Sequence, residues 1–302
     1  MNGVIVIDKP KDYTSFDVVA IVRKVSGEKK IGHTGTLDPM ATGVLPILLG
    51  SAAKAQSVLP NTDKAYKARL KLGLTTDTLD ITGKVLTNQN SNIRKEEFEN
   101  ALKRFFGRQN QIPPMFSAIK VDGVRLYDLA RKGVEIEREA REIYISKLVL
   151  NEFDFEAQTA QIEVVCSKGT YIRSLIDDIG KALDCGAVMT GLRRTCACGY
   201  NTDDALEISA LKEMSKTDIE ALLKPTESIF YSYPQISVSE AQATRFYNGG
   251  ALDIERTALK NTSEDKKIYR VKTKDDVFLG LGITDLSDGI IKVFKHFESD
   301  KF

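Results

Sequence analysis

The sequence predicts an α+β fold in two parts, and two observations support this prediction. Segments with strand patterns and segments with helical patterns follow one another without the regular strand–helix alternation of a doubly wound protein. After SYPQ (232–235) the pattern changes to short strands and turns such as VFLGLGI (277–283). We therefore expect a large α+β domain at 1–233 and a small β-rich domain at 234–302.

The first elements along the chain are a buried strand and a capped helix. VIVI (4–7) is an apolar run typical of a buried strand. TSFDVVAIVRKVSG (14–27) predicts a helix with a Thr-Ser pair to cap its start and Gly27 after its end. Its apolar residues recur at helical spacing and are expected to face the core; they are Phe16, Val19 and Val22. SAAKAQSVLP (51–60) predicts a short helix that ends at its proline.

The clearest strand is YKARLKL (66–72), which alternates strictly between apolar and basic residues. Its inward face is expected to hold Tyr66, Ala68, Leu70 and Leu72. The segment KAYKARLK (64–71) has four basic residues and no acid, whereas residues 201–240 hold eight acids and three lysines. On a chain of net charge +1, such a local basic surface suits a partner recognised by shape. A solvated strand face explains it equally well.

The middle of the chain mixes helices and strands. RKEEFENALKRFFG (94–107) is an amphipathic helix pattern, and IPPMFSAIKVDG (112–123) is a proline-led loop that runs into a strand. RLYDLARKG (125–133) predicts a short helix. Two alternating segments at about 143–155 and 161–166 predict an antiparallel pair.

SKGTYIRSLIDDIGKAL (167–183) predicts a helix that is entered through a glycine and has a stripe of Ile and Leu residues. Arg173 lies in the first turn of this helix, beside the stripe, so its guanidinium can reach a half-buried acid. The acidic stretch 201–240 predicts one more helix, which ends near Pro225.

The composition is that of an ordinary soluble chain, with 42% hydrophobic and 28% charged residues. No apolar run approaches the length of a membrane span, and the first residues lack a signal-peptide pattern, so we expect no membrane contact and a cytoplasmic location. The four cysteines include the pair Cys196 and Cys198, but with only two histidines their spacing matches no common zinc pattern. We expect reduced thiols, no disulfide and no metal.

The stretch GHTGTLDPMATGVLP (32–46) predicts a structured loop, because it surrounds one acid, Asp38, with glycines, prolines and threonines. The chain has no Walker A sequence, no GxGxxG after a strand and no nucleophile elbow, which argues against nucleotide-cofactor and serine–histidine chemistry. Glycoside hydrolysis needs two carboxylates. Taken alone, Asp38 is better explained as stabilising the turn before Pro39, but Gly35 and Gly43 would let a polymer approach closely.

This stretch resembles the signature of the TruB family of tRNA pseudouridine synthases, whose single catalytic aspartate matches Asp38. Further segments resemble family motifs in the expected order, over residues 3 to about 195; they are DKPKDYTSFD, KAYKARLKLGLTTDTLD, PPMFSAIKVDGVRLYDLAR, CSKGTYIRSLIDDIG and GLRRT. One departure is Asp12, which stands where the family usually has glycine. Asp tolerates left-handed backbone better than most residues, so we expect the turn to persist.

The resemblance implies the pseudouridine synthase fold, with a central mixed, mainly antiparallel sheet flanked by helices and an RNA-gripping insertion at about 90–145. It also implies a PUA-like RNA-binding domain at 234–302. The implied reaction is the isomerisation of a uridine in the T-loop of tRNA to pseudouridine, after the base has been flipped out of its stack. The implied partner is the T-stem–loop of tRNA, with no cofactor and no required protein partner.

The resemblance implies catalytic roles for three residues. Asp38 would be the nucleophile or its electrostatic equivalent, acting on the ribose or on the pyrimidine ring. Arg173 would pair with Asp38 and keep it ionised and fixed in direction. Tyr66 would stack on the target base, and its hydroxyl would accept or relay the proton that leaves the ring carbon.

Further residues are implied in substrate binding alongside Tyr66; they are His33, Tyr171, Leu192, Lys9 and Lys168. Tyr171 and Leu192 would line the pocket, and His33 would fill space vacated in the RNA loop. The two lysines would make phosphate or structural contacts. Taken singly, each of these residues has an ordinary explanation as a core or surface residue, and only their joint occurrence with Asp38 favours the functional one.

Two alternatives remain open from the sequence. A guide-RNA-dependent synthase related to dyskerin has a similar signature, but usually has a longer N-terminal extension and a different residue pair where this chain has Met40 and Ala41. The other alternative is a tRNA-binding chaperone without essential catalysis. The intact set of Asp38, Tyr66 and Arg173 argues against a loss of chemistry.

Overall fold

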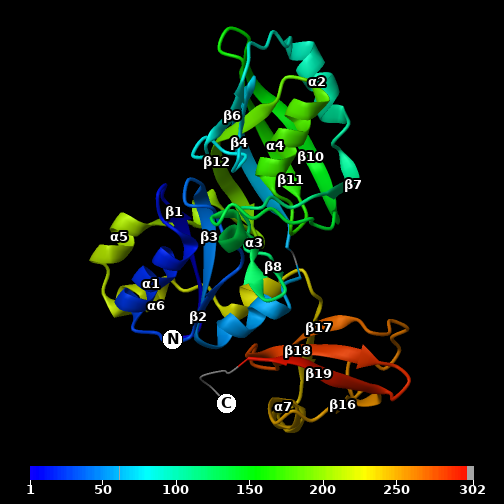
Figure 1. The fold of residues 1–302 in the computed structure, drawn as a ribbon. Helices are drawn as coiled ribbons and strands as arrows, with labels where there is room; N and C mark the ends of the chain where they lie inside the picture. The colour runs from blue at the N-terminus through cyan, green and yellow to red at the C-terminus, as the bar shows by residue number, and fades with distance from the viewer. Residues whose placement is uncertain (61, 298–302) are drawn as a thin grey trace.

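Two main sheets organise the structure, a computed structural model that describes residues 1–60 and 62–297 (Figure 1). The large sheet has the order β14–β1–β3–β12–β4–β11–β10–β7, with β2 beside β3 and β13 beside β12. Its strands are β1 (Gly3–Lys9), β2 (Ile31–His33), β3 (Thr42–Leu49), β4 (Lys64–Leu72), β7 (Gly107–Gln111), β10 (Arg141–Asp154), β11 (Thr159–Cys166), β12 (Ala187–Ala197), β13 (Tyr200–Asn201) and β14 (Leu206–Glu207). Among the described strands of this sheet, the pairs β1/β14 and β3/β12 are parallel and the others antiparallel, which confirms the predicted mixed, mainly antiparallel sheet.

Strands β1 and β3 are buried on both faces, as their continuous apolar sequences suggest. Helices α1 (Ser15–Ser26), α5 (Ile208–Glu213) and α6 (Lys216–Leu222) pack on one face of these strands. The 3-10 helices η1 (Gly50–Ser57) and η3 (Thr226–Phe230) pack on the other. The acidic stretch thus forms two short α-helices, where the sequence predicted one.

Helix α1 begins and ends as predicted, with a reciprocal capping box at its start and a left-handed Gly27 (φ 71°) after its end. Its buried apolar residues are Val18, Val19 and Val22. The prediction that Phe16 faces the core is wrong, since this side chain is 66% exposed. Its ring instead makes an edge contact with the ring of His33, at a centroid distance of 5.7 Å.

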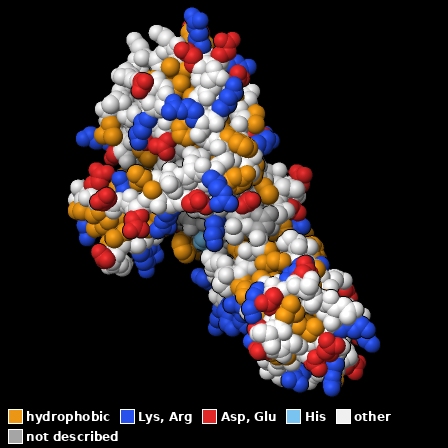
Figure 2. Space-filling view, turned by 90° about the vertical axis from the view of Figure 1, so that its right-hand side faces the viewer, with side chains coloured by type: hydrophobic (Ala, Val, Ile, Leu, Met, Phe, Trp, Pro, Cys, Tyr) orange, Lys and Arg blue, Asp and Glu red, His pale blue; other side chains and the backbone are white. Residues whose placement is uncertain are grey.

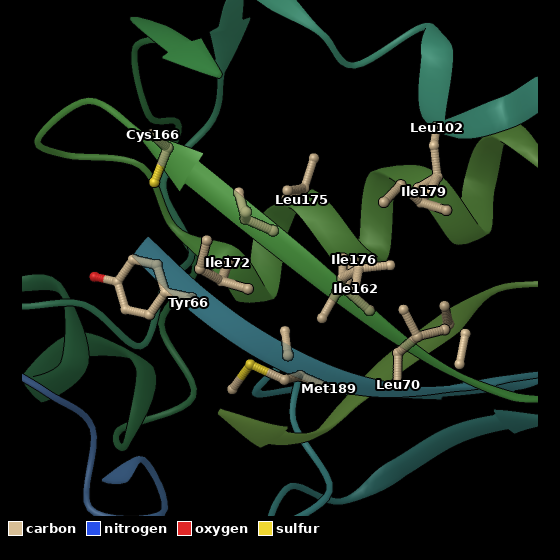
Figure 3. Close-up of a cluster of buried hydrophobic side chains, with 14 of the residues drawn as sticks. Tyr66, Leu70, Leu102, Ile162, Cys166, Ile172, Leu175, Ile176, Ile179 and Met189 are labelled. Carbon is tan, nitrogen blue, oxygen red and sulfur yellow. The ribbon is translucent and has the colours of Figure 1, made fainter. Parts of the chain in front are cut away.

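The other half of the sheet carries the core that Figure 3 shows. Here β4, β10, β11 and β12 pack against α4 (Ile172–Ala182) and α2 (Lys95–Lys103). The predicted alternation of β4 is confirmed, because its inward residues are buried; they are Tyr66, Ala68, Leu70 and Leu72. Tyr66 lies at the edge of the cluster, and its hydroxyl points away from Ile172 and Met189 (Figure 3).

The stretch 32–46 is only partly a loop. Its first two residues belong to β2, residues 34–41 form the loop, and its last five residues begin the buried strand β3. Pro46 lies within β3, where its carbonyl accepts a hydrogen bond from Thr34 N at 3.2 Å. The prediction of loop structure for the whole stretch is therefore corrected: the apolar run from Val44 to Leu49 outweighs the turn residues that precede it.

The middle of the chain adds short elements outside the large sheet, including the two-stranded sheets β5–β6 and β8–β9. They are β5 (Leu74–Thr76), β6 (Val85–Asn88), β8 (Lys120–Val121), β9 (Val124–Arg125) and α3 (Leu126–Ala130). The predicted antiparallel pair is confirmed as β10 and β11. Strands β7 and β12 were not predicted, because β7 is a polar edge strand and β12 carries arginines in place of an alternating pattern.

The second sheet lies in the last part of the chain, here called the C-terminal lobe (235–297), and has the order β15–β17–β18–β19–β16. Its elements are β15 (Gln235–Val238), α7 (Glu240–Tyr247), β16 (Leu252–Asp253), η4 (Ile254–Arg256), β17 (Ile268–Thr273), β18 (Phe278–Asp285) and β19 (Ile290–His296), which confirm the predicted β-rich end of the chain. The lobe packs onto the main body. Phe230 of η3 contacts Phe297 with centroids 5.3 Å apart, and Arg270 Nη1 lies 2.6 Å from Glu227 Oε1.

Within the described part of the chain, no helix is long and apolar enough to cross a membrane. The four cysteines are free thiols; Cys166, Cys185 and Cys198 are buried and Cys196 is partly exposed. No three His, Cys, Asp or Glu side chains of the described residues gather as a metal site would require.

Candidate active site

Asp38 lies in the loop between β2 and β3, and hydrogen bonds fix the backbone on both sides of it. Leu37 N donates to Ser15 Oγ at 2.9 Å, and Asp12 N donates to Pro39 O at 2.8 Å. Asp12 has the left-handed backbone (φ 67°) expected of it. The side chain of Asp38 is 35% exposed, so a substrate can reach a carboxylate whose surroundings are rigid.

Lys9 supports the same loop from inside the protein. Its ammonium group donates to the carbonyl oxygens of Pro10 at 2.9 Å, Tyr13 at 2.6 Å and Pro39 at 3.2 Å. The residue is fully buried, and this burial lowers the pKa of Lys9 to about 8. The expectation of a substrate contact is therefore corrected: Lys9 has no free surface for a phosphate, and the structural alternative accounts for it.

Arg173, in the first turn of α4, holds the carboxylate of Asp38 with two atoms. Its Nε lies 2.9 Å from Asp38 Oδ2, and its Nη2 donates to Asp38 Oδ1 at 3.2 Å. The remaining donors bind the carbonyls of Thr78 at 3.0 Å and Phe116 at 2.9 Å, and Nη1 lies 3.9 Å from Asp80 Oδ2. A buried guanidinium with its donors occupied has little freedom to rotate, so it fixes the direction of the carboxylate.

The pKa of the Asp38 carboxyl is raised above its ordinary value, chiefly because burial disfavours the charged form. Arg173 acts in the opposite direction, Asp80 raises the pKa further, and Lys9 lowers it. Asp80 itself is held in place by its neighbours, since its Oδ1 accepts hydrogen bonds from Thr78 Oγ1 at 2.9 Å and from Thr82 N at 3.0 Å. The site thus presents one carboxylate that is more basic than a free aspartate and is fixed by an arginine.

Tyr66 lies on β4, and its ring is buried. Burial raises the pKa of the Tyr66 hydroxyl to about 12, while the guanidinium of Arg194 acts to lower it. At neutral pH the hydroxyl therefore keeps its proton. This state suits a hydrogen-bond donor or a proton relay, and it argues against a hydroxyl that is ionised in advance to accept a proton.

Tyr171 and Leu192 come from different elements. Tyr171 is the N-cap of α4, where the side-chain amide of Gln111 clamps its backbone: Tyr171 N donates to Gln111 Oε1 at 2.8 Å, and Gln111 Nε2 donates to Tyr171 O at 3.0 Å. Leu192 pairs with Ala68 across β12 and β4 and packs against the core that contains Tyr66. Both side chains are half-buried, and their contact with a substrate stays a prediction.

His33 and Lys168 differ in their surroundings. Gly35 N donates to His33 Nδ1 at 3.2 Å, and burial lowers the pKa of His33, so the ring is neutral with its proton on Nε2. Lys168 is exposed in the turn before α4, beside Arg108 and Tyr144 at a surface hollow. Of the two lysines singled out from the sequence, Lys168 is the exposed one, and its contact with a phosphate stays a prediction.

Several residues of the site were not predicted. Arg194 and Gln111 are buried polar residues that fix the loop and the start of α4; Arg194 lies in a motif that the sequence analysis quoted, but nothing in a single sequence distinguishes it from its neighbour Arg193. Gly43 has a different role from the one expected. A Cβ atom at Gly43 would lie 2.1 Å from Arg194 O, so this glycine allows β3 and β12 to pair closely and does not open a path for a polymer.

The sequence model of the "TruB family pseudouridylate synthase (N terminal domain)" matches residues 23–172, and that of the "tRNA pseudouridylate synthase B C-terminal domain" matches residues 173–231. The chain is 45% identical over 283 residues to tRNA pseudouridine synthase B of Clostridium tetani, which covers 93% of this chain and 95% of that protein. This chain belongs to the TruB family of pseudouridine synthases. It is therefore an isomerase, as predicted.

A second relative and a solved structure are also similar to this chain. The tRNA pseudouridine synthase B of Clostridium kluyveri is 40% identical over 97% of this chain and 100% of that protein. Among solved structures, a chain of a Cbf5–Nop10–Gar1 complex superposes with a TM-score of 0.75 at 25% identity, over 99% of this chain and 86% of that chain. This structural similarity agrees with the fold that the resemblance implied.

Proposed function

We propose that this TruB family member isomerises a uridine in the T-loop of tRNA to pseudouridine. The observation that carries the proposal is the Asp38 carboxylate, which is reachable from solvent and gripped at both oxygens by Arg173. The high identity to proteins named tRNA pseudouridine synthase B supports tRNA as the substrate.

The reaction exchanges one glycosidic bond for another and moves one proton. The target base leaves its stack, the bond between ribose C1′ and base N1 breaks, the base turns, and C1′ bonds to C5. The proton on C5 leaves and N1 gains a proton, so the atoms balance without a second substrate. Asp38 acts as the nucleophile or the stabilising anion, on the ribose or on the ring, and Arg173 holds it in the attacking direction.

The residues around Asp38 would hold the flipped base. Tyr66 would stack on it from β4, and Tyr171 and Leu192 would close the pocket. Phe16 and His33 form a contiguous aromatic surface beside the loop of Asp38, and exposed aromatic rings are suited to stacking on unpaired RNA bases.

The remaining RNA contacts would come from two segments outside the core of the site. In the insertion at about 90–145, the guanidinium groups of Arg125 and Arg131 lie 5.7 and 5.5 Å from the centre of the Tyr127 ring. The C-terminal lobe would act as a PUA-like RNA-binding domain at 234–302. Figure 2 shows a hollow between the main body and the lower lobe, with Lys and Arg side chains beside it.

The test is a guide-free assay with purified protein and a bare T-stem–loop RNA. Quantitative conversion of one loop uridine to pseudouridine, without guide RNA or another protein, is the expected result. Conversion only after a guide RNA and partner proteins are added would favour the dyskerin-like alternative. Accelerated tRNA refolding without any conversion would favour the chaperone.

A further inference from the structure

Arg194 is the largest fully buried side chain of the described residues. It lies in a row that crosses the sheet: Tyr66 on β4 pairs with Arg194 on β12, Arg194 pairs with Gly43 on β3, and Gly43 pairs with Lys9 on β1. Side chains of directly paired residues project from the same face of a sheet. The row therefore places the Arg194 guanidinium behind the Asp38 loop and beside Tyr66.

One nitrogen of the Arg194 guanidinium has no hydrogen-bond partner among the described residues. Its Nε donates to Val44 O at 2.7 Å and its Nη2 to Gly35 O at 3.1 Å, but its buried Nη1 has no hydrogen-bond partner. The Asp38 carboxylate, whose charge acts together with that of Arg194 on Lys9 and Tyr66, is paired with Arg173. No ion pair among the residues that the structure describes includes Arg194.

A buried guanidinium that is not in an ion pair is costly, because burial disfavours a charged group. Its field acts on the groups around it. Burial has the largest effect on the pKa of each neighbour. The charge of Arg194 acts with burial to lower the pKa of His33 and of Lys64, whose Nζ lies near Gly35, and it opposes the rise that burial causes in the pKa of Tyr66. The site thus has a fixed positive potential on the side of the Tyr66 hydroxyl, which would stabilise a negative charge that forms next to it.

We propose that Arg194 is a positioning residue that makes the Tyr66 hydroxyl a strong hydrogen-bond donor to the uracil anion formed when the glycosidic bond breaks. The inference rests on the proposed function. When the bond between C1′ and N1 breaks, its electron pair leaves with the base, and the negative charge spreads over N1 and the ring oxygens. Tyr66 keeps its proton and donates a hydrogen bond to this anion. When C5 bonds to C1′, the electron pair returns to the new bond and the hydrogen bond weakens.

A purely structural role is the competing explanation, since Arg194 also binds the backbone of the loop at Gly35 and Val44. The two roles differ in their dependence on the leaving group. Fluorine at C5 withdraws electrons and stabilises the departing anion, so 5-fluorouridine needs less help from the protein at this step. A displaced loop would slow both substrates equally.

The experiment compares Arg194→Met with the wild type on a T-stem–loop RNA that carries uridine or 5-fluorouridine at the target position. Consumption of the starting nucleoside is followed in a single turnover with enzyme in excess. Arg193→Met is the matched control, because Arg193 is the next residue, is 40% exposed and pairs with Asp8 on the opposite face of the sheet. RNA affinity and thermal unfolding are measured for each variant.

We expect Arg194→Met to react roughly 10- to 100-fold more slowly on uridine, with RNA affinity retained and a clearly smaller deficit on 5-fluorouridine. Arg194→Lys, which keeps the charge, should recover part of the rate, and it replaces Arg194→Met if that variant does not fold. Equal deficits on the two substrates, or an Arg194→Met rate equal to that of Arg193→Met, would overturn the proposal. If the wild type converts neither RNA, the proposed function itself fails.

Discussion

Arg173 meets both carboxylate oxygens of Asp38, with Nε 2.9 Å from Oδ2 and Nη2 3.2 Å from Oδ1. The same guanidinium binds the carbonyls of Thr78 and Phe116, which lie in two other segments of the chain. One side chain thus joins the loop that holds Asp38 to the hairpin after β4 and to the segment that contains Phe116. The direction of the carboxylate depends on this junction.

Arg173→Lys should be far more damaging than a conservative exchange suggests. An ammonium group can neither meet both oxygens of Asp38 in one plane nor bind Thr78 and Phe116 at the same time. We expect the single-turnover rate to fall by roughly 100-fold or more, because small errors in the position of a reacting group are costly. A rate near that of the wild type, measured with saturating enzyme, would show that the pairing has no catalytic role.

The rate should depend on pH through Asp38. Only the ionised carboxylate is active, so kcat/KM rises with pH through the pKa of Asp38 in the free enzyme. Because burial raises this pKa, the acid limb should lie above the value of about 4 for a free aspartate. Arg173 lowers the pKa, so Arg173→Gln should move the limb to higher pH. A limb that stays in place or moves to lower pH in this variant would contradict the assignment.

Tyr66→Phe and Tyr66→Leu should separate stacking from the hydroxyl. Tyr66→Phe keeps the ring, so RNA affinity should be retained while pseudouridine formation is strongly slowed. Tyr66→Leu should also lose affinity, by about 1–3 kcal/mol if the ring stacks on the target base. Binding is measured by titration and the product by nucleoside analysis. Normal pseudouridine formation by Tyr66→Phe would leave the tyrosine with a stacking role alone.

Substitutions of Lys9 and of Lys168 should affect different quantities, the rate of the chemical step for Lys9 and RNA binding for Lys168. Lys168 is exposed, so Lys168→Ala should weaken RNA binding and reduce the slope of log affinity against log salt by about 1, as the loss of one phosphate contact does. Lys9 is buried against three carbonyls, so Lys9→Met should leave this slope unchanged and slow the chemical step instead. A reduced slope in Lys9→Met would mean that this lysine reaches the RNA.

Local patterns were sufficient to predict much of the site. The helical register placed Arg173 beside the apolar stripe of α4, and the alternation of β4 turned Tyr66 inward; both predictions are confirmed. Asp12 adopts the left-handed backbone that its place in the turn requires. These features depend on residues close in sequence, which a periodic pattern describes directly.

Long-range contacts account for the features of the fold and the site that the sequence did not predict. Lys9 is buried because carbonyls from three positions converge on its ammonium group, and Arg194 because β3 and β12 pair closely at Gly43. Phe16 fits a helical stripe in the sequence, but the neighbouring Val18 takes the buried position. Such outcomes depend on which distant segments meet, and a single sequence does not specify them.

The contact between the C-terminal lobe and the large sheet is another feature that the sequence alone did not predict. From the sequence it looks like a separable module after Pro234, but Phe297 and Leu281 belong to one core with Val4 and Val44 of the large sheet. Deletion of the lobe would therefore expose that core as well as remove RNA contacts. Substitutions on the exposed surface of the lobe are the better way to test its role in binding.

The most direct test of the catalytic assignment is a single-turnover assay of Asp38→Asn on a guide-free T-stem–loop RNA. Asparagine preserves the shape of the side chain but removes the charge, while RNA affinity depends on many contacts elsewhere. We predict that pseudouridine formation is abolished and that RNA affinity stays within a few-fold of the wild type. Pseudouridine formation by Asp38→Asn at a rate near that of the wild type would contradict the central role of Asp38.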